Sequence, residues 1–363
     1  MKYSTNSNQR GAVSLFVVIF SALLITIVTV GFIQVMLRNQ QAATTADLSR
    51  SAYDSALGGV EDAKRAIVLA AANGTLAKST ECNSVATILG RDPNTKTETV
   101  IKQDEKDATL SQAYTCATID PTPGEVVYDS VAPGKSKIIP LKTVDNKPFN
   151  KVVISWKPTS GIPVDRTRPL SSGVTLPRTS EWGVNTPALL RAQLIQTNGS
   201  FKLSDFDTKS DGTASDNART KFLYPFSFTS SPSNSFEFSN DSIPTAIACS
   251  KIDDYACKVT LLNLPGDAST RQAFLHISTI YNTAGVKIVL MQDDTVVNFS
   301  GVQAKVDSTG RAGDLFRRVK ATVDLSNSDF PYPEAALDLT GNLCKTFRVT
   351  DNIADYDAGS CTP

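Results

Sequence analysis

Only one histidine, His276, occurs in the 363 residues of the chain. It lies in the apolar, strand-like run 273–277, so we expect it to be structural rather than a general base. The chain contains no Gly-x-Ser-x-Gly elbow, no phosphate-binding glycine loop and no His-Glu-x-x-His pair. A catalytic site would have to be assembled from residues that no motif marks. The sequence therefore predicts a protein that is not an enzyme.

Six cysteines are the other side chains with distinctive chemistry. None has Cys-x-x-Cys spacing, and a single histidine argues against a Cys/His metal site. An even number of cysteines, in a domain that the N-terminal segment described below would place outside the cytoplasm, favours disulfides. We predict sequential pairing, although the sequence leaves other connectivities open. The predicted pairs are Cys82 with Cys116, Cys249 with Cys257, and Cys344 with Cys361.

A loop rich in carboxylates surrounds Gly212. Calcium binds where carboxylate and carbonyl oxygens converge, but the spacing departs from an EF-hand because Lys209 stands at a ligand position. The sequence favours a solvated acidic loop and no cofactor, with calcium as the alternative. The candidate ligands are Asp205, Asp207, Asp211 and Asp216.

The stretch 12–37 is uncharged and dominated by Leu, Ile, Val and Phe. It is as long as the run of about 20 apolar residues that spans a bilayer. A removed signal peptide is the alternative, but its apolar core is shorter, about 7 to 15 residues, and ends in small residues at the cleavage site. Here Arg38 and further polar residues follow instead. We therefore predict a transmembrane helix segment over 12–37.

The helical pattern continues beyond the apolar run, over 38–72, as an amphipathic segment. Asn73-Gly74 supplies an expected C-terminal cap, so 12–72 is predicted to be one helix, with a kink allowed at Gly58-Gly59. An ordinary membrane anchor with a stalk packed on its own domain would give the same pattern. The residues of the apolar stripe are Leu48, Ala52, Ala56, Val60, Ala63, Ile67 and Ala70.

A short leader ending in Gln9-Arg10-Gly11, the apolar run opening with 12–16, and the segment Ser51–Ala63 together resemble the type IV pilins. The resemblance is closest to minor pilins of the PilX and GspK kind and covers about 70 residues. It implies that residues 1–11 are a leader that a prepilin peptidase removes after Gly11, leaving an N-methylated Ala12. It also implies that the apolar helix packs in a filament core, through residues such as Phe16, Leu23, Leu24, Ile27 and Phe32.

One departure from the family's pattern concerns the fifth residue of the processed chain. Most pilins carry a Glu there, thought to pair with the N-terminal amine of a neighbouring subunit, whereas this chain has Phe16. Subunits similar to GspK share an apolar residue at this position, and the resemblance places them at a filament tip. We therefore expect a minor, tip-proximal or priming pilus subunit that is structural and possesses an adhesive surface. A type II secretion pseudopilin and a signal-anchored solitary adhesin remain alternatives.

The resemblance also implies location and partners. The chain would cross the cytoplasmic membrane once with its C-terminal domain outside, and then enter an extracellular filament. Its partners would be the prepilin peptidase, other pilin subunits, the assembly machinery and the surface of another cell. Independently, 36 basic and 36 acidic residues give a net charge of zero. Nucleic acid is therefore not expected to be a main partner.

Residues 73–363 are predicted to form a β-rich extracellular domain, giving an α+β fold class with a mostly antiparallel sheet. The last two strands are expected to form a hairpin whose longish loop opens at Asp307. A proline-rich segment suggests a division of the β region near 160–187. The predicted strands are Lys151–Trp156, Ala188–Gln196, Phe222–Phe228, Phe236–Phe238, Ala246–Lys251, Ala256–Leu262, Ala273–Tyr281, Val286–Met291, Val302–Val306 and Phe316–Val323.

Overall fold

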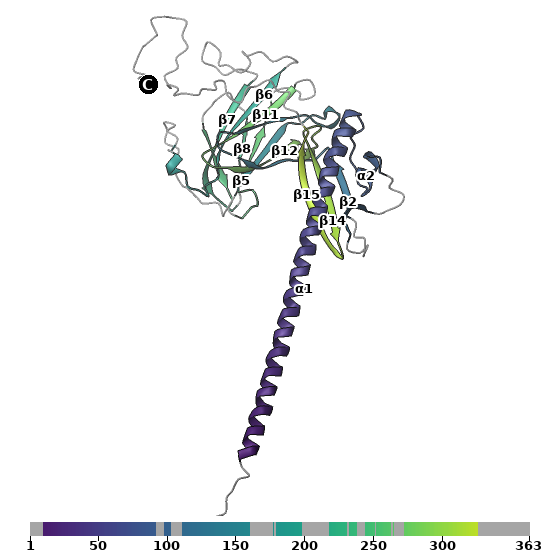
Figure 1. Cartoon of the computed structure of the whole chain (residues 1–363). Coiled ribbons are helices and arrows are strands. Elements are labelled where there is room, and N and C mark those ends of the chain that lie inside the picture. The colour runs from purple at the N-terminus through teal and green to yellow at the C-terminus, as the bar shows by residue number, and fades with distance from the viewer. Residues whose placement is uncertain are drawn as a thin grey trace, which may run out of the picture. The chain divides into compact units, whose positions relative to one another are not determined.

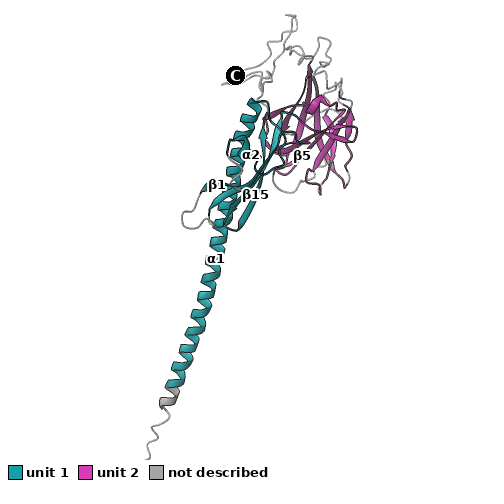
Figure 2. Ribbon diagram, turned by 90° about the vertical axis from the view of Figure 1, so that its right-hand side faces the viewer, with its two compact units in different colours: residues 1–123, 300–325 teal, residues 124–299, 326–363 magenta. Residues whose placement is uncertain are grey.

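The computed structural model contains one long helix followed by a β-rich region, which is the predicted α+β class (Figure 1). The chain divides into two compact units, described separately below (Figure 2). Unit 1 comprises 1–123 and 300–325, and unit 2 comprises 124–299 and 326–363. The structure describes residues 10–91, 98–102, 111–159, 177, 179–197, 218–230, 232–237, 244–250, 252–262, 264 and 272–325.

The helix α1 (Arg10–Ala72) is unbroken, which confirms the predicted single helix over 12–72. Its 63 residues span about 95 Å at 1.5 Å per residue. It ends as the sequence predicts. Gly74 has φ +65°, and the Thr75 N–H donates to the Ala70 carbonyl at 2.8 Å, which closes the last turn. A short helix, α2 (Ser84–Ile88), follows in unit 1.

Unit 1 also contains a four-stranded antiparallel sheet in the order β1-β2-β14-β15. The predicted C-terminal hairpin is confirmed, but its loop is much shorter than expected. Asp307 and the residues after it continue β14, and only Gly313 and Asp314 separate the two strands. The strands are β1 (Thr99–Lys102), β2 (Gln112–Asp120), β14 (Gln303–Ala312) and β15 (Leu315–Asp324).

The second half of α1 packs against this sheet at very short range. Ala52, Ala56 and Ala63 are completely buried. A Cβ atom added at Gly59 would lie 2.2 Å from the Ser308 hydroxyl oxygen, so only glycine fits beneath β14 there. The helix runs unbroken through Gly58-Gly59. These glycines therefore allow close approach of helix and sheet, whereas the sequence had suggested a kink.

Unit 2 is built on an 11-stranded sheet that mixes parallel and antiparallel pairs. The order is β13-β12-β5-β10-β9-β7-β6-β11-β4, with β3 on β12 and β8 on β10. Two 3₁₀ turns, Val144–Asn146 and Thr179–Glu181, complete it. The strands are β3 (Val126–Val131), β4 (Ser136–Pro140), β5 (Lys151–Pro158), β6 (Leu189–Thr197), β7 (Ala218–Phe228), β8 (Ser235–Glu237), β9 (Pro244–Cys249), β10 (Cys257–Leu262), β11 (Gln272–Ile280), β12 (Ala284–Gln292) and β13 (Thr295–Val297).

In sequence, the described part of unit 2 is an insertion between β2 and β14 of unit 1. The boundaries at 123/124 and 299/300 differ from the division expected near 160–187. The strands on either side of that interval, β5 and β6, belong to the same sheet. The side chain of the buried Trp156 on β5 also donates to the Ala188 carbonyl at 2.9 Å. The described strands that precede and follow the proline-rich segment thus belong to the same unit.

Candidate functional site

The first half of α1 is the main candidate surface, because its large apolar side chains have no cover within the described chain. From Leu15 to Leu37 these side chains are 54% to 72% exposed. The helix is long and apolar enough to cross a membrane. The predicted filament-core residues all belong to this surface, with exposed fractions of 72% for Phe16, 55% for Leu23, 56% for Leu24, 62% for Ile27 and 71% for Phe32.

Three hydroxyl side chains in this apolar half are hydrogen-bonded within the helix itself. Ser21 donates to the Val18 carbonyl at 3.0 Å, and Thr26 donates to the Leu23 carbonyl at 2.8 Å. Thr29 donates to the Ile25 carbonyl at 2.6 Å. Because each hydroxyl already has an acceptor on its own helix, none needs water when the segment is buried in lipid or among other helices.

The processing residues of the predicted cleavage site, Gly11 and Ala12, both have helical backbone within α1. The helix extends to Arg10, so the site lies at the beginning of α1. The sheet of unit 1 packs on the second half of α1, not on this end of the helix. The cleavage itself remains a prediction.

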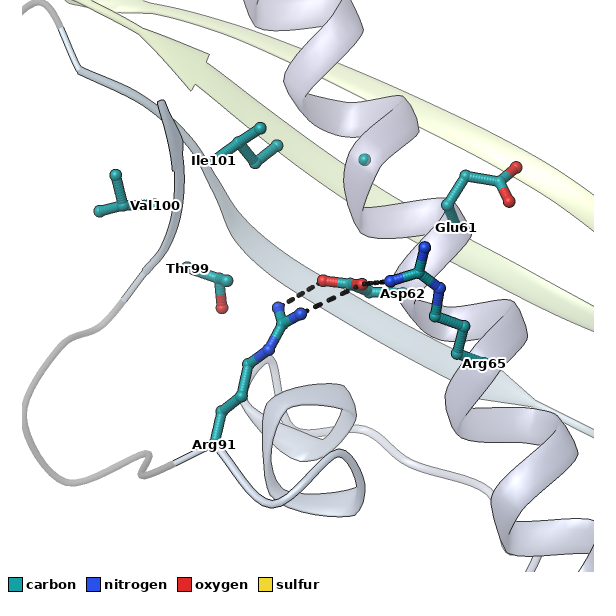
Figure 3. A pocket seen from close by; sticks show the side chains of 8 residues that line it. Glu61, Asp62, Arg65, Arg91, Thr99, Val100 and Ile101 are labelled. Atoms are coloured by element: carbon teal, nitrogen blue, oxygen red, sulfur yellow. Dashed lines mark hydrogen bonds and ion pairs between the residues drawn. The ribbon is translucent and has the colours of Figure 1, made fainter. Parts of the chain in front are cut away.

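Asp62 is the centre of a charged cluster on the second half of α1 (Figure 3). Its side chain is only 12% exposed. The Arg91 guanidinium contacts both carboxylate oxygens, the Tyr114 hydroxyl donates to Oδ2 at 2.9 Å, and Arg65 Nη1 lies 3.6 Å from Oδ1. The cluster therefore joins α1, the segment after α2 and β2.

These contacts raise the pKa values of two groups in the cluster, Arg91 and Tyr114. The hydrogen bond to Asp62 raises the pKa of Arg91 above its ordinary value. Burial, aided by the hydrogen bond to Asp62, raises the pKa of Tyr114. The phenol therefore stays protonated and can donate at neutral pH. Sequence reasoning did not single out this cluster, although an acidic residue at the edge of a buried helix face is a signal that a partner is needed.

A groove of about 450 Å³ borders the cluster, between α1 and the edge strand β1. It is open to solvent, and Figure 3 shows Asp62, Arg65 and Arg91 converging while Glu61 points away from them. Its lining residues are Gly58, Glu61, Asp62, Arg65, Arg91, Thr99, Val100 and Ile101.

The end of the β14–β15 hairpin is tied to α1 and to the segment before β1. Both Nε and Nη2 of Arg317 donate to the Ser49 hydroxyl, at 2.8 and 2.6 Å. Arg311 donates from Nε and Nη2 to the two carboxylate oxygens of Glu98, at 2.9 and 2.7 Å. Such bidentate contacts fix orientation as well as distance, so they hold the hairpin in register with the helix.

Two of the predicted disulfides are present. Cys82–Cys116 ties the segment around α2 to β2 in unit 1, and Cys249–Cys257 joins β9 to β10 in unit 2. Cys344 and Cys361 lie outside the described residues. Both observed pairs follow the predicted sequential order.

Among the residues that the structure describes, the remaining candidates for site chemistry give no further site. The calcium candidates Asp205, Asp207, Asp211 and Asp216 lie outside the described residues. Within the described ranges, no three His, Cys, Asp or Glu side chains are grouped to hold a metal ion. His276 is 5% exposed on β11, with Nδ1 3.3 Å from the Gln193 side-chain oxygen. This burial fits the structural role that its apolar surroundings suggest.

No known family model, no curated protein sequence and no solved structure matches this chain.

Proposed function

We propose that this chain is a minor, tip-proximal or priming subunit of a type IV pilus, with a structural and adhesive role. One observation carries the proposal: a single unbroken helix has an apolar half that no described residue covers and a second half packed against a four-stranded sheet. A soluble stalk would not need the first half. An anchor with a stalk packed on its own domain shares this arrangement, and the N-terminus of the mature chain distinguishes it from a pilin. Both halves of the helix have a role if it is held first by lipid and then by sister helices.

Moving the apolar half of α1 from lipid to contact with neighbouring subunits is energetically demanding. Each large apolar side chain gains about 1.5 to 3 kcal/mol when it is removed from water, so the exposed half of α1 cannot pass through an aqueous state. Neighbouring helices must replace lipid as the surface withdraws, and an assembly ATPase of the machinery would drive the cycle. The internally bonded hydroxyls of Ser21, Thr26 and Thr29 suit both surroundings.

The position in the filament is proposed from Phe16. Without a carboxylate at the fifth position of the processed chain, the subunit cannot neutralise the N-terminal amine of a neighbour, an interaction that would be strong in lipid. A subunit at the tip of the filament has no earlier subunit whose N-terminal amine it would need to neutralise. Copy number along purified filaments tests this step, and a chain found as the bulk shaft component would contradict it.

Unit 2 is proposed to present the binding surface, because the insertion leaves the helix and sheet of unit 1 complete without it. The target is proposed to be the surface of another cell, and the subunit itself is proposed to catalyse nothing. The processed chain would pass from the cytoplasmic membrane, with both units outside, into the extracellular filament. Its partners would be the prepilin peptidase, other pilins and the assembly machinery.

Two alternatives make different predictions. A type II secretion pseudopilin would share the helix and its processing, and would be distinguished by loss of protein secretion rather than of pili when the chain is deleted. A signal-anchored solitary adhesin would keep its leader and would stay in the membrane fraction even when pilus machinery is present.

The N-terminus of the mature protein is the deciding measurement. We expect mass spectrometry of the chain from its producing cells to find an N-methylated Ala12 as the first residue. A Gly11→Val variant should keep Met1 and remain in the membrane, since the resemblance places the cleavage after Gly11. A wild-type chain that keeps residues 1–11 would refute the pilin proposal.

A further inference from the structure

We propose that the groove between α1 and β1 binds a carboxylate side chain of a neighbouring subunit, with Arg65 and Arg91 as the recognising groups. This inference rests on the proposed pilin function and adds to it a specific contact. It concerns unit 1 alone, and all of the lining residues belong to that unit.

The first argument is the balance of charge in the groove. Glu61 also lines the groove, but its carboxylate is paired with Lys64, whose ammonium lies 2.6 Å from Oε1 and which does not line the groove. Within the groove, two guanidinium groups share one carboxylate, that of Asp62. Counted over the described side chains Glu61, Asp62, Lys64, Arg65 and Arg91, the surplus is one positive charge, which a single carboxylate from outside would balance.

The second argument is the state of Arg65. Its side chain is 72% exposed, and its ion pair with Asp62 is long, at 3.6 Å. A guanidinium has five N–H donors in a planar fork that matches a carboxylate, and this single contact uses few of them. Arg91 is also 44% exposed, although it holds Asp62 tightly. Both guanidinium groups line the groove and are accessible to solvent, so a further carboxylate can reach them.

The third argument is the apolar part of the groove lining. Val100 and Ile101 line the groove, and Ile101 is 49% exposed although it is large and apolar. Arginine with apolar neighbours is the composition that distinguishes the centre of protein interfaces from the rest of a surface. Since α1 continues from this surface into the half that neighbours are proposed to cover, the occupant is best assigned to another pilin subunit rather than to a small anion.

A chemical test uses Arg65→Lys, which keeps the positive charge and places a primary amine in the groove. A carbodiimide activates a carboxyl group, and the amine displaces the urea to form an amide at zero length. We expect treatment of intact filaments to give a crosslink between position 65 and an Asp or Glu of another subunit, identified by peptide mass spectrometry. A crosslink only to Asp62 or Glu61 of the same chain, or none, would overturn the proposal.

Lys64 provides the internal control for that experiment. It immediately precedes position 65 on the helix, is 45% exposed and carries an amine, but it is paired with Glu61 and does not line the groove. We expect Lys64 to be crosslinked only within its own chain. An intersubunit crosslink at Lys64 as frequent as that at position 65 would show that the reagent reports proximity of subunits rather than this groove, and would count against the proposal.

Assembly gives a second readout with a matched pair of variants. Arg65→Gln should lower incorporation into filaments about tenfold, the effect of losing one favourable charge contact of about 1.4 kcal/mol, whereas Lys64→Gln should change it little. Equal incorporation of the two variants would refute the groove's role. The pilin function is tested separately. It is refuted if the wild-type chain lacks the Ala12 terminus. If that terminus is found but position 65 forms no intersubunit crosslink, the pilin function stands and only the role of the groove is refuted.

Discussion

Gly310 on β14 lies directly against Ala52 on α1: a Cβ atom at Gly310 would approach the Ala52 carbonyl oxygen to 2.2 Å and the Ala56 amide nitrogen to 2.2 Å. Both obstacles are backbone atoms of a long helix, so they cannot rotate away as a side chain would. The distance between helix and sheet in unit 1 is therefore set by the absence of a side chain at this residue.

Gly310→Ala should destabilise unit 1 by about 3 kcal/mol, because the added methyl group forces the helix and β14 apart. Hydrogen exchange of peptides from β2 and β14 would measure the loss, with the full chain in detergent. Gly31→Ala serves as the control, since nothing lies within 4 Å of a Cβ atom there. Unchanged protection in the Gly310 variant would mean that the helix is not held as tightly as the structure shows.

Asp62 should contribute far more to stability than its neighbour Glu61. Asp62→Asn leaves Arg91 and Tyr114 without a carboxylate in a largely buried position, and we expect a loss of about 2 kcal/mol. Glu61→Gln removes only an exposed pair with Lys64 and should cost about 0.3 kcal/mol. Exchange protection of β2 would compare the two variants, and similar effects from both would contradict the buried role of Asp62.

The pH dependence of unit 1 should include a contribution from Asp120. Burial by itself would raise the pKa of Asp120, but the Lys78 ammonium at 2.7 Å and the Thr122 donors outweigh burial and lower that pKa. The resulting stability is present above the unfolded-state pKa of about 4 and is lost as pH falls through the lower folded-state pKa.

Asp120→Asn should therefore reduce the free energy of unfolding near pH 7 by about 0.5 to 1 kcal/mol and have little effect near about pH 2. Urea unfolding followed by far-ultraviolet circular dichroism over a pH series would test this. The exposed Asp54 gives a control substitution, Asp54→Asn, without the ion pair. An equal difference at both pH values would exclude an electrostatic cause.

The two observed disulfides should stabilise their own units to different extents. On the chain-entropy model, the wider loop closed by Cys82–Cys116 contributes about 4 kcal/mol and the short loop closed by Cys249–Cys257 about 2.5 kcal/mol. Paired serine substitutions would remove each one. Both tryptophans of the chain, Trp156 and Trp182, lie in unit 2. Fluorescence should therefore respond mainly to loss of the second disulfide, while exchange of β2 responds to loss of the first.

The helix was predictable because its pattern is local. Apolar residues at three- and four-residue steps and the Asn73-Gly74 end are visible without knowing the partner that the stripe contacts. Most strands of unit 2 were also predictable, since inward residues such as Val152, Ile154 and Trp156 are large and alternate or run together. The positions of the first two disulfides followed from the number and order of the cysteines.

The sheet of unit 1 was harder to recognise, and β1 and β2 were not predicted. The core-facing residues of β2 include Ala117, which is completely buried but too small to give a clear hydrophobic alternation. The same holds for Ser308 and Gly310 on β14, which explains why the hairpin loop was placed too early. Close approach of α1 requires these small residues, so the feature that packs the sheet also hides it from pattern analysis.

The cluster around Asp62 depends on contacts between distant parts of the chain, from position 62 to positions 91 and 114. No local periodicity encodes such a contact. The sequence shows only that an acid lies beside an otherwise small and apolar helix face, and the identity of its partners requires the fold.

The placement of unit 2 between β2 and β14 also has a consequence for biosynthesis. At about 5 to 20 residues per second, a ribosome takes roughly 10 to 35 seconds to make the intervening segment. Throughout that delay the nascent helix has emerged while the strand that covers its alanine stripe has not yet been synthesised. The membrane end of α1 can anchor the unfinished polypeptide meanwhile, so a chaperone that shields the stripe would be needed only until β14 arrives.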